Sequence, residues 1–156
     1  MSPGTDPIAL RRAIPCVGVA LLGIVAGGVI SAVLAHAPAR AVMWLVAYLV
    51  LVVGVAQGVL ALVQAHVARQ PPSRALVAAQ CIAFNLANAL VMAGTLRGRP
   101  AWVSVGAVLL VAALGLFLRG VRGSRGALVQ IYRLLLATLA VSALVGVALA
   151  VWHARG

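Results

Sequence analysis

The chain has 156 residues, of which 65% are hydrophobic and 8% are charged. A soluble domain typically has about 45–50% apolar and about 25% charged residues, so this apolar excess is too large for the core of one small soluble domain. We therefore expect an all-α integral membrane protein, with lipid in place of water around its outer wall.

The charge of the chain is almost entirely positive. All 12 cationic side chains are arginine, and Asp6 is the only acidic residue. A net charge of +11 can indicate nucleic-acid binding, but these arginines lie in small groups between apolar runs and form no basic face. We therefore expect no nucleic-acid partner and interpret the arginines as determinants of membrane topology. The absence of lysine and glutamate favours a bacterial origin.

Five apolar runs are long enough to cross a bilayer, which requires about 20 residues. They are residues 14–35, 42–64, 75–96, 101–118 and 131–152. Short connections such as RQPPSR and RGRP separate them, and Ser73 and Pro100 precede the third and fourth runs. Because such short loops make consecutive helices antiparallel neighbours, we predict one five-helix transmembrane domain over residues 1–156.

The first apolar run also resembles a secretory signal, because Arg11 and Arg12 precede it and it ends in AHA. The apolar core of a signal peptide usually has about 7–15 residues. The run over residues 14–35 is longer than that, so we expect a retained transmembrane helix.

The arginines predict an orientation. With a cytoplasmic N-terminus, eight lie at inner ends of the spans: Arg11, Arg12, Arg69, Arg74, Arg119, Arg122, Arg125 and Arg133. Four lie at outer ends: Arg40, Arg97, Arg99 and Arg155. This bias favours a multi-pass protein of the bacterial inner (plasma) membrane with its C-terminus outside. Under the same threading Trp44, Trp102 and Trp152 all lie at the outer interface, where indole rings are enriched.

The third run contains an amide-rich stretch, QCIAFNLANALVMAGTL. On a helical wheel of about 100° per residue, its polar residues gather within about 140° of one another. This face comprises Gln80, Cys81, Phe84, Asn85, Asn88, Met92 and Thr95. In the second run Gln57 and Gln64 nearly eclipse each other beside small residues. We expect both faces to point away from lipid, and a hydrogen bond from Gln57 to Asn85 or to Gln80 is geometrically reasonable.

The free-energy cost of an unpaired amide in hydrocarbon indicates that these amides have hydrogen-bond partners. An unpaired amide in hydrocarbon costs several kcal/mol, whereas an interhelical hydrogen bond contributes only about 0.6–2 kcal/mol. The amides are therefore expected to join helices to one another. The alternative is a polar cavity for a ligand or permeant, since intramembrane polar groups also line such paths.

Small residues predict close helix packing at three places. Gly23 and Gly27 form one GxxxG pair, and Gly54 and Gly58 form another. Thr138, Ser142, Gly146 and Ala150 form a stripe along the fifth run. Each set is consistent with packing inside the bundle or against another subunit.

The chemistry of an enzyme is missing from the apolar runs. They contain no Asp, Glu or Lys, and the chain has no phosphate loop, HExxH motif or paired CxxC motif. Cys16 and Cys81 are interpreted as small buried hydrophobes. His36, His153, Met43 and Met92 fall near the outer surface and are a candidate metal or haem site, but no ligand spacing supports it. We expect no catalytic residue, metal or cofactor.

These observations lead to a hypothesis and two alternatives. We expect a non-catalytic accessory or structural subunit of a larger membrane complex, such as a respiratory assembly, with lipids and other membrane subunits or its own copies as partners. The first alternative is a small oligomeric channel or transporter, with a pathway lined by Gln57, Gln80, Asn85 and Asn88. The second is a haem- or quinone-linked redox protein.

Overall fold

The computed structural model describes residues 6–36 and 39–153, and in this part of the chain every regular element is a helix. Five helices are long and apolar enough to cross a membrane: Pro7–Val33, Arg40–Val67, Arg74–Leu96, Pro100–Gly120 and one that begins at Ala127. The predicted fold class, an all-α bundle of five transmembrane helices, is confirmed.

The helices extend beyond the apolar runs that predicted them. The elements are α1 (Pro7–Val33), α2 (Arg40–Tyr48), a π-helical segment η1 (Leu49–Ala56), α3 (Gln57–Val67), α4 (Arg74–Leu96), α5 (Pro100–Gly120) and α6 (Ala127–His153). Hydropathy marks the part of a helix suited to hydrocarbon, whereas the helix itself continues into the headgroup region. The predicted boundaries at residues 14 and 131 are therefore too late.

The early start of α1 has a local cause. The carboxylate of Asp6 accepts a hydrogen bond of 2.8 Å from the backbone N–H of Ile8, and Pro7 occupies the first helical position. A side-chain oxygen at the N-cap satisfies a backbone donor that has no intrahelical partner, and proline has no such donor to satisfy. Arg11 and Arg12 consequently lie within the helix.

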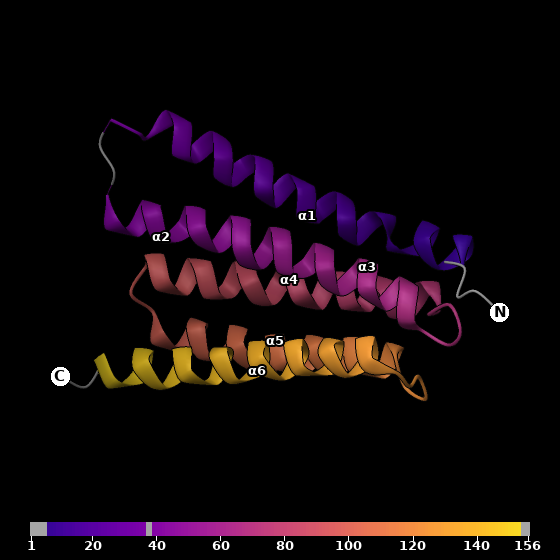
Figure 1. Ribbon diagram of the computed structural model, residues 1–156. Helices are drawn as coiled ribbons and strands as arrows, with labels where there is room; N and C mark the ends of the chain where they lie inside the picture. The colour runs from indigo at the N-terminus through magenta and orange to yellow at the C-terminus, as the bar shows by residue number, and fades with distance from the viewer. Residues whose placement is uncertain (1–5, 37–38, 154–156) are drawn as a thin grey trace.

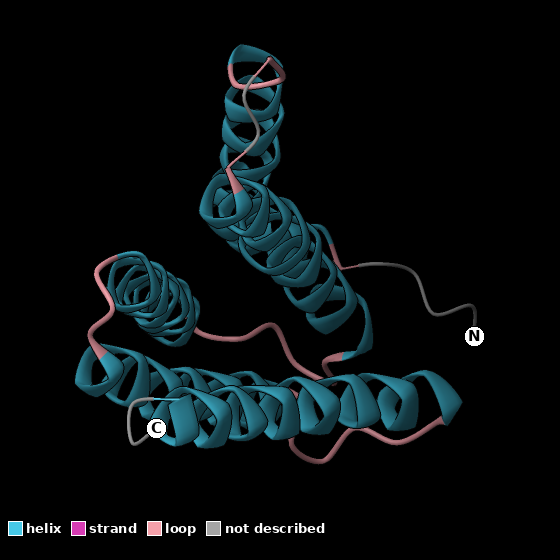
Figure 2. Cartoon of the chain, turned by 90° about the vertical axis from the view of Figure 1, so that its left-hand side faces the viewer, coloured by secondary structure: helices cyan, strands magenta, loops and turns pink. Residues whose placement is uncertain are grey.

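α2, η1 and α3 follow one another without a break and form the second membrane helix, Arg40–Val67. Figure 1 shows α1 on one side of the bundle and α5 with α6 on the other, with the second membrane helix and α4 between them. α1 packs mainly on η1 and α3, and α4 packs mainly on α5. In Figure 2, α1 and the second membrane helix form one pair, set apart from α4, α5 and α6.

The alternating helices give the bundle two different ends, and α6 ends at the end opposite to the one where α1 begins (Figure 1). We call one the arginine end: it contains the start of α1 and the connections at residues 68–73 and 121–126. The eight arginines predicted to share one side lie in these segments or in the adjoining helix turns. The opposite end, which we call the tryptophan end, contains Trp44, Trp102 and Trp152.

The main hydrophobic core lies where α3, α4, α5 and α6 meet. Phe84 of α4 and Phe117 of α5 pack edge to face, with ring centroids 6.1 Å apart. Tyr132 of α6 is buried beside them, and its hydroxyl donates to the carbonyl of Leu60 at 3.3 Å. This core joins the first half of α6 to the rest of the bundle.

α4 and α5 approach each other closely through two glycines. A Cβ atom at Gly106 would lie 2.9 Å from the carbonyl oxygen of Ala87 and 2.9 Å from the backbone nitrogen of Val91. A Cβ atom at Gly94 would lie 2.8 Å from the backbone nitrogen of Val103. Only a residue without a side chain permits this contact between backbones. Gly106 belongs to no GxxxG pair, and the glycine four residues after Gly94, Gly98, lies beyond the end of α4.

Candidate functional site

The predicted amide residues are concentrated inside the bundle. Gln57, Gln64, Gln80 and Asn88 are buried, with at most 3% of each exposed. Asn85 is half-buried, and Thr95 is exposed. We call the four buried residues and Asn85 the amide cluster. It lies between the pair formed by α1 with the second membrane helix and the group formed by α4 with α5.

Asn88 bonds to a second helix and to its own helix. Its side-chain oxygen accepts a hydrogen bond of 2.7 Å from the hydroxyl of Tyr48, on α2. Its nitrogen donates to the carbonyl of Phe84 at 2.8 Å. The sequence analysis missed Tyr48. A signal was present, because a tyrosine deep in an apolar run requires a partner for its hydroxyl.

Gln57 links three helices, but not through the amides that were expected. Its Nε2 donates to the backbone carbonyl of Cys16 on α1 at 3.2 Å and to the sulfur of Cys81 on α4 at 3.7 Å. The prediction that Gln57 bonds to Asn85 or Gln80 is therefore wrong. Its Oε1 is buried and has no hydrogen-bond partner in the part of the chain that the structure describes.

The π-helical segment explains how Tyr48 and Gln57 both reach α4. On an uninterrupted α-helix, residues nine positions apart point about 180° away from each other at about 100° per residue. The wider turns of a π-helix rotate each residue by less than an α-helix does. Eight residues of η1 lie between Tyr48 and Gln57, and both side chains contact α4, at Asn88 and Cys81. A helical wheel drawn for a regular α-helix could not place them on one face.

Asn85 is satisfied within its own helix. Its side-chain nitrogen donates to the carbonyl of Cys81 at 2.8 Å and contacts the sulfur of that residue at 3.7 Å. Asparagine can bond locally to the carbonyl four residues earlier, and this competes with bonds to other helices. Asn85 therefore differs from Asn88, although the sequence analysis treated them alike.

The two remaining glutamines lie near the arginine end. Gln80 donates from its Nε2 to the carbonyl of Leu116 on α5 at 2.9 Å. The side chain of Gln64 packs directly on Gly120, where a Cβ atom would collide with it. The Nε2 of Gln64 is buried without a hydrogen-bond partner among the described residues. Both glutamines line a cavity of about 10 Å³, close to the smallest volume that holds one water molecule.

The glycines of the two predicted GxxxG pairs differ in how closely the neighbouring helix approaches them. Gly23 and Gly54 bring α1 and η1 together, because a Cβ atom at Gly23 would lie 3.3 Å from the backbone nitrogen of Gly54. A Cβ atom at Gly27 would lie 2.6 Å from the Val50 side chain. Gly58 has more room, since its nearest contact would be the methyl group of Ala20 at 3.5 Å.

Three residues of the small-residue stripe of α6 are exposed in the described part of the chain. Thr138, Ser142 and Gly146 are exposed, and no heavy atom lies within 4 Å of a Cβ atom built at Gly146. Ser142 and Gly146 line a groove of about 370 Å³ at the tryptophan end, together with Tyr48 and Thr95. The stripe was expected to pack either inside the bundle or against another subunit. The exposure of Thr138, Ser142 and Gly146 excludes the bundle interior for these three residues.

The candidate metal ligands differ in their exposure in the described structure. His36 and Met43 are exposed, Met92 is half-buried, and the side chain of His153 lies outside the described part of the chain. Among the residues described, no three His, Cys, Asp or Glu side chains lie together.

Five apolar helices and an interior joined by amide hydrogen bonds indicate a multi-pass membrane protein. Comparison of the chain with protein-family models, with curated proteins and with solved structures gives no match. The contacts within the bundle are therefore the basis for assigning a function.

Proposed function

We propose that this chain is a non-catalytic integral membrane subunit that packs against other membrane helices, either in a larger complex or in its own oligomer. We place it in a bacterial plasma membrane, with the arginine end in the cytoplasm and the C-terminus outside. The observation that carries the proposal is that the amide cluster bonds mainly to protein groups inside the bundle.

The contacts of α4 show how the amides are used. Through Asn88 and Cys81, α4 meets the second membrane helix, and through Gln80 it is bonded to α5. Gln57 adds a bond from the second membrane helix to α1. Each interhelical bond contributes about 0.6–2 kcal/mol, so several together fix the arrangement of the helices. Such an interior supports a structural role.

The second half of α6 supplies a surface for a partner. In the described part of α6, the buried residues Val129, Tyr132 and Leu136 all lie in its first half. Beyond them, Val141, Leu144 and Val145 are exposed beside Ser142 and Gly146. Small residues permit close approach of another helix in a membrane, where hydrophobic burial does not drive association. A helix from another subunit fits this face.

A small oligomeric channel or transporter is the second candidate, and the unpaired polar atoms favour it. Oε1 of Gln57 and Nε2 of Gln64 are buried without partners among the described residues. Buried polar groups of this kind are usually bonded to protein or to ordered water. The cavity beside Gln64 is large enough for about one water molecule. A channel would require further water molecules that form a continuous path through the amide cluster.

Affinity purification in a mild detergent tests the leading proposal. We expect the tagged chain to elute with a membrane protein in fixed ratio, or as a defined oligomer. Gly146→Leu is expected to remove this association, because the larger side chain covers the exposed face of α6. Gly28→Leu is the matched control, because Gly28 is also an exposed helical glycine with open space around its Cβ position.

Two results would contradict the proposal that the chain is a subunit of a larger assembly. One is a chain that elutes alone and monomeric under conditions that preserve membrane complexes. The other is solute flux into liposomes that contain only this chain, with the flux lost in Asn85→Leu and Asn88→Leu variants of unchanged thermal stability. The second result would establish the channel or transporter instead.

A further inference from the structure

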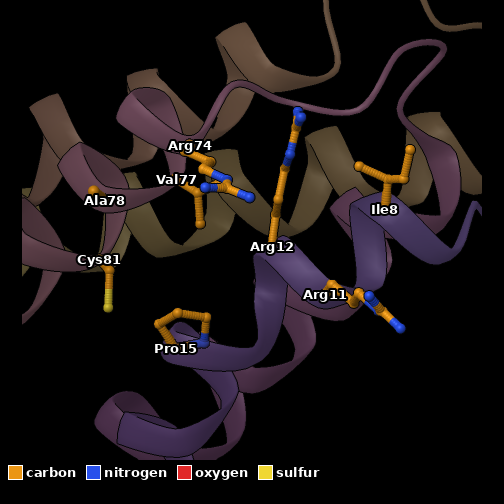
Figure 3. Close-up of a pocket in the computed structure, with 8 residues that line it drawn as sticks. All are labelled: Ile8, Arg11, Arg12, Pro15, Arg74, Val77, Ala78 and Cys81. Atoms are coloured by element: carbon orange, nitrogen blue, oxygen red, sulfur yellow. The ribbon is translucent and has the colours of Figure 1, made fainter.

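A groove of about 610 Å³ lies between α1 and α4 at the arginine end. Figure 3 shows the side chains that line it: Arg11, Arg12 and Pro15 belong to α1, and Arg74, Val77 and Cys81 belong to α4. The groove is unrelated to the bonds that join the amide cluster to α5 and to Tyr48. It therefore requires an explanation of its own.

Arginines form the mouth of the groove. Nη1 of Arg12 donates to the carbonyls of Pro71 at 3.2 Å and Pro72 at 2.7 Å, which fixes this side chain beside the α3–α4 connection. Figure 3 shows Arg74 extending toward Arg12, whereas Arg11 points away from both. A guanidinium has five N–H donors. Nη1 of Arg12 binds these two carbonyls, so the N–H groups on Nε and Nη2 remain as donors.

Among the described residues, no ion pair provides a counterion for this mouth. Asp6 is its only acidic side chain, and the Asp6 carboxylate accepts the N–H of Ile8 as the cap of α1. Guanidinium groups bind phosphate well, because their planar donors match two phosphate oxygens at once. The group that complements these arginines is therefore an anion from outside the chain. Phosphate matches the arginines in both charge and geometry.

Below the arginines the groove is apolar. Val77, Ala78 and Cys81 line the α4 side, and the ring of Pro15 lies opposite them. Seven residues separate Arg74 from Cys81, which corresponds to a depth of about 10 Å at 1.5 Å per residue. A ligand that matches both parts has an anionic head at the end of the bundle and a hydrocarbon tail beside the helices.

We propose that this groove binds one anionic phospholipid, with its phosphate at Arg12 and Arg74 and one acyl chain along Val77, Ala78 and Cys81. A lipid satisfies the two parts of the groove together, whereas free phosphate satisfies only the arginines. Basic pockets between transmembrane helices bind lipid headgroups by the same physics. This inference depends on membrane insertion and is independent of the subunit proposed above.

Binding of phosphatidylglycerol to the purified, delipidated full chain tests the inference, by native mass spectrometry and by thermal stability in detergent. We expect phosphatidylglycerol to bind and to raise Tm, and phosphatidylcholine with the same acyl chains to do so much less. Arg74→Gln should weaken phosphatidylglycerol binding about fivefold, as expected for one arginine near an anionic headgroup. Arg12 is left unchanged, because its bonds to Pro71 and Pro72 also hold the connection.

Two matched controls separate the site from general effects. Arg40→Gln removes an exposed arginine from the first position of a helix at the other end and should leave binding unchanged. Ala78→Phe fills the groove and should weaken binding, whereas Ala79→Phe, at the next exposed position of α4, should not.

Three outcomes would overturn the inference. The first is equal binding of phosphatidylglycerol and phosphatidylcholine by the unmodified chain. The second is an equal loss of binding in Arg40→Gln and Arg74→Gln, which would indicate a diffuse charge effect. The third is stabilisation by inorganic phosphate equal to that by phosphatidylglycerol, together with an Ala78→Phe variant that binds normally, which would indicate a phosphate site without a lipid tail.

Discussion

Replacing Gly106 with alanine is expected to destabilise the bundle by about 1–3 kcal/mol, the usual cost of overpacking a tight core. The new methyl group would meet the carbonyl oxygen of Ala87 and the backbone nitrogen of Val91, each at 2.9 Å. Both atoms belong to the backbone of α4, so no side-chain rotation relieves the contact. α4 and α5 must move apart, and the measurement is the free energy of unfolding in detergent.

Gly115→Ala is the matched control for this prediction. Gly115 lies on the same helix, and no heavy atom lies within 4 Å of a Cβ atom built there. Alanine is about 0.5–1 kcal/mol better than glycine inside a helix, so this variant should be neutral or stabilising. Equal stability of the two variants would contradict the close α4–α5 contact.

The second large effect is expected from the bond between Tyr48 and Asn88. Asn88→Leu leaves the Tyr48 hydroxyl without its acceptor in the interior, and such an unsatisfied group costs about 1–3 kcal/mol. The partner change, Tyr48→Phe, leaves Oδ1 of Asn88 without its donor. A double-mutant cycle should give a coupling energy of about 0.6–1.7 kcal/mol, from the average to the largest value typical of hydrogen bonds between membrane helices.

Asn85→Leu provides the comparison for Asn88→Leu. Asn85 is half-buried and bonds only to Cys81 of its own helix, so its replacement should cost clearly less. A coupling energy of zero between Tyr48 and Asn88, or a larger loss from Asn85→Leu, would contradict the assignment of Asn88 as an interhelical contact.

The number of helices and the general position of the polar face were predictable from sequence, because both depend on hydropathy and helical period. Gln80 and Asn88 lie on the predicted face of α4 and are buried. Thr95 belongs to the same face of the wheel but is exposed. Its place near the end of α4 puts it at the rim of the groove beside α6, where the bundle no longer encloses that face.

The partners of Gln57 and Gln80 were not predictable, because they depend on features with no periodic signal. The π-helical segment between Tyr48 and Gln57 changes which residues share a face. Gln57 and Gln80 bond to backbone carbonyls, of Cys16 and Leu116, and every residue type carries such an acceptor. A search for polar side chains that could pair with one another could not identify them.

The helix-packing surfaces were also only partly predictable from the sequence. Gly106 makes a close backbone contact between α4 and α5 without forming a GxxxG motif, and Gly94 makes another although its GxxxG partner, Gly98, lies outside the helix. The stripe with Ser142 and Gly146 resembles a packing surface, but both residues are exposed in the described structure and the space around Gly146 is open. Whether a small residue packs depends on the position of the neighbouring helix, and the sequence of one helix does not contain that position.

The central claim is that Gln57, Gln80 and Asn88 of the amide cluster bond to protein and are closed to water. Exchange of side-chain amide protons with water, measured by NMR on the chain with ¹⁵N-labelled glutamine and asparagine in lipid nanodiscs, tests it directly. We predict slow exchange for Gln57, Gln80 and Asn88, and fast exchange for the exposed amide of Gln70 in the α3–α4 connection. Exchange at Gln57 and Asn88 as fast as at Gln70 would show a water-filled interior and contradict the account.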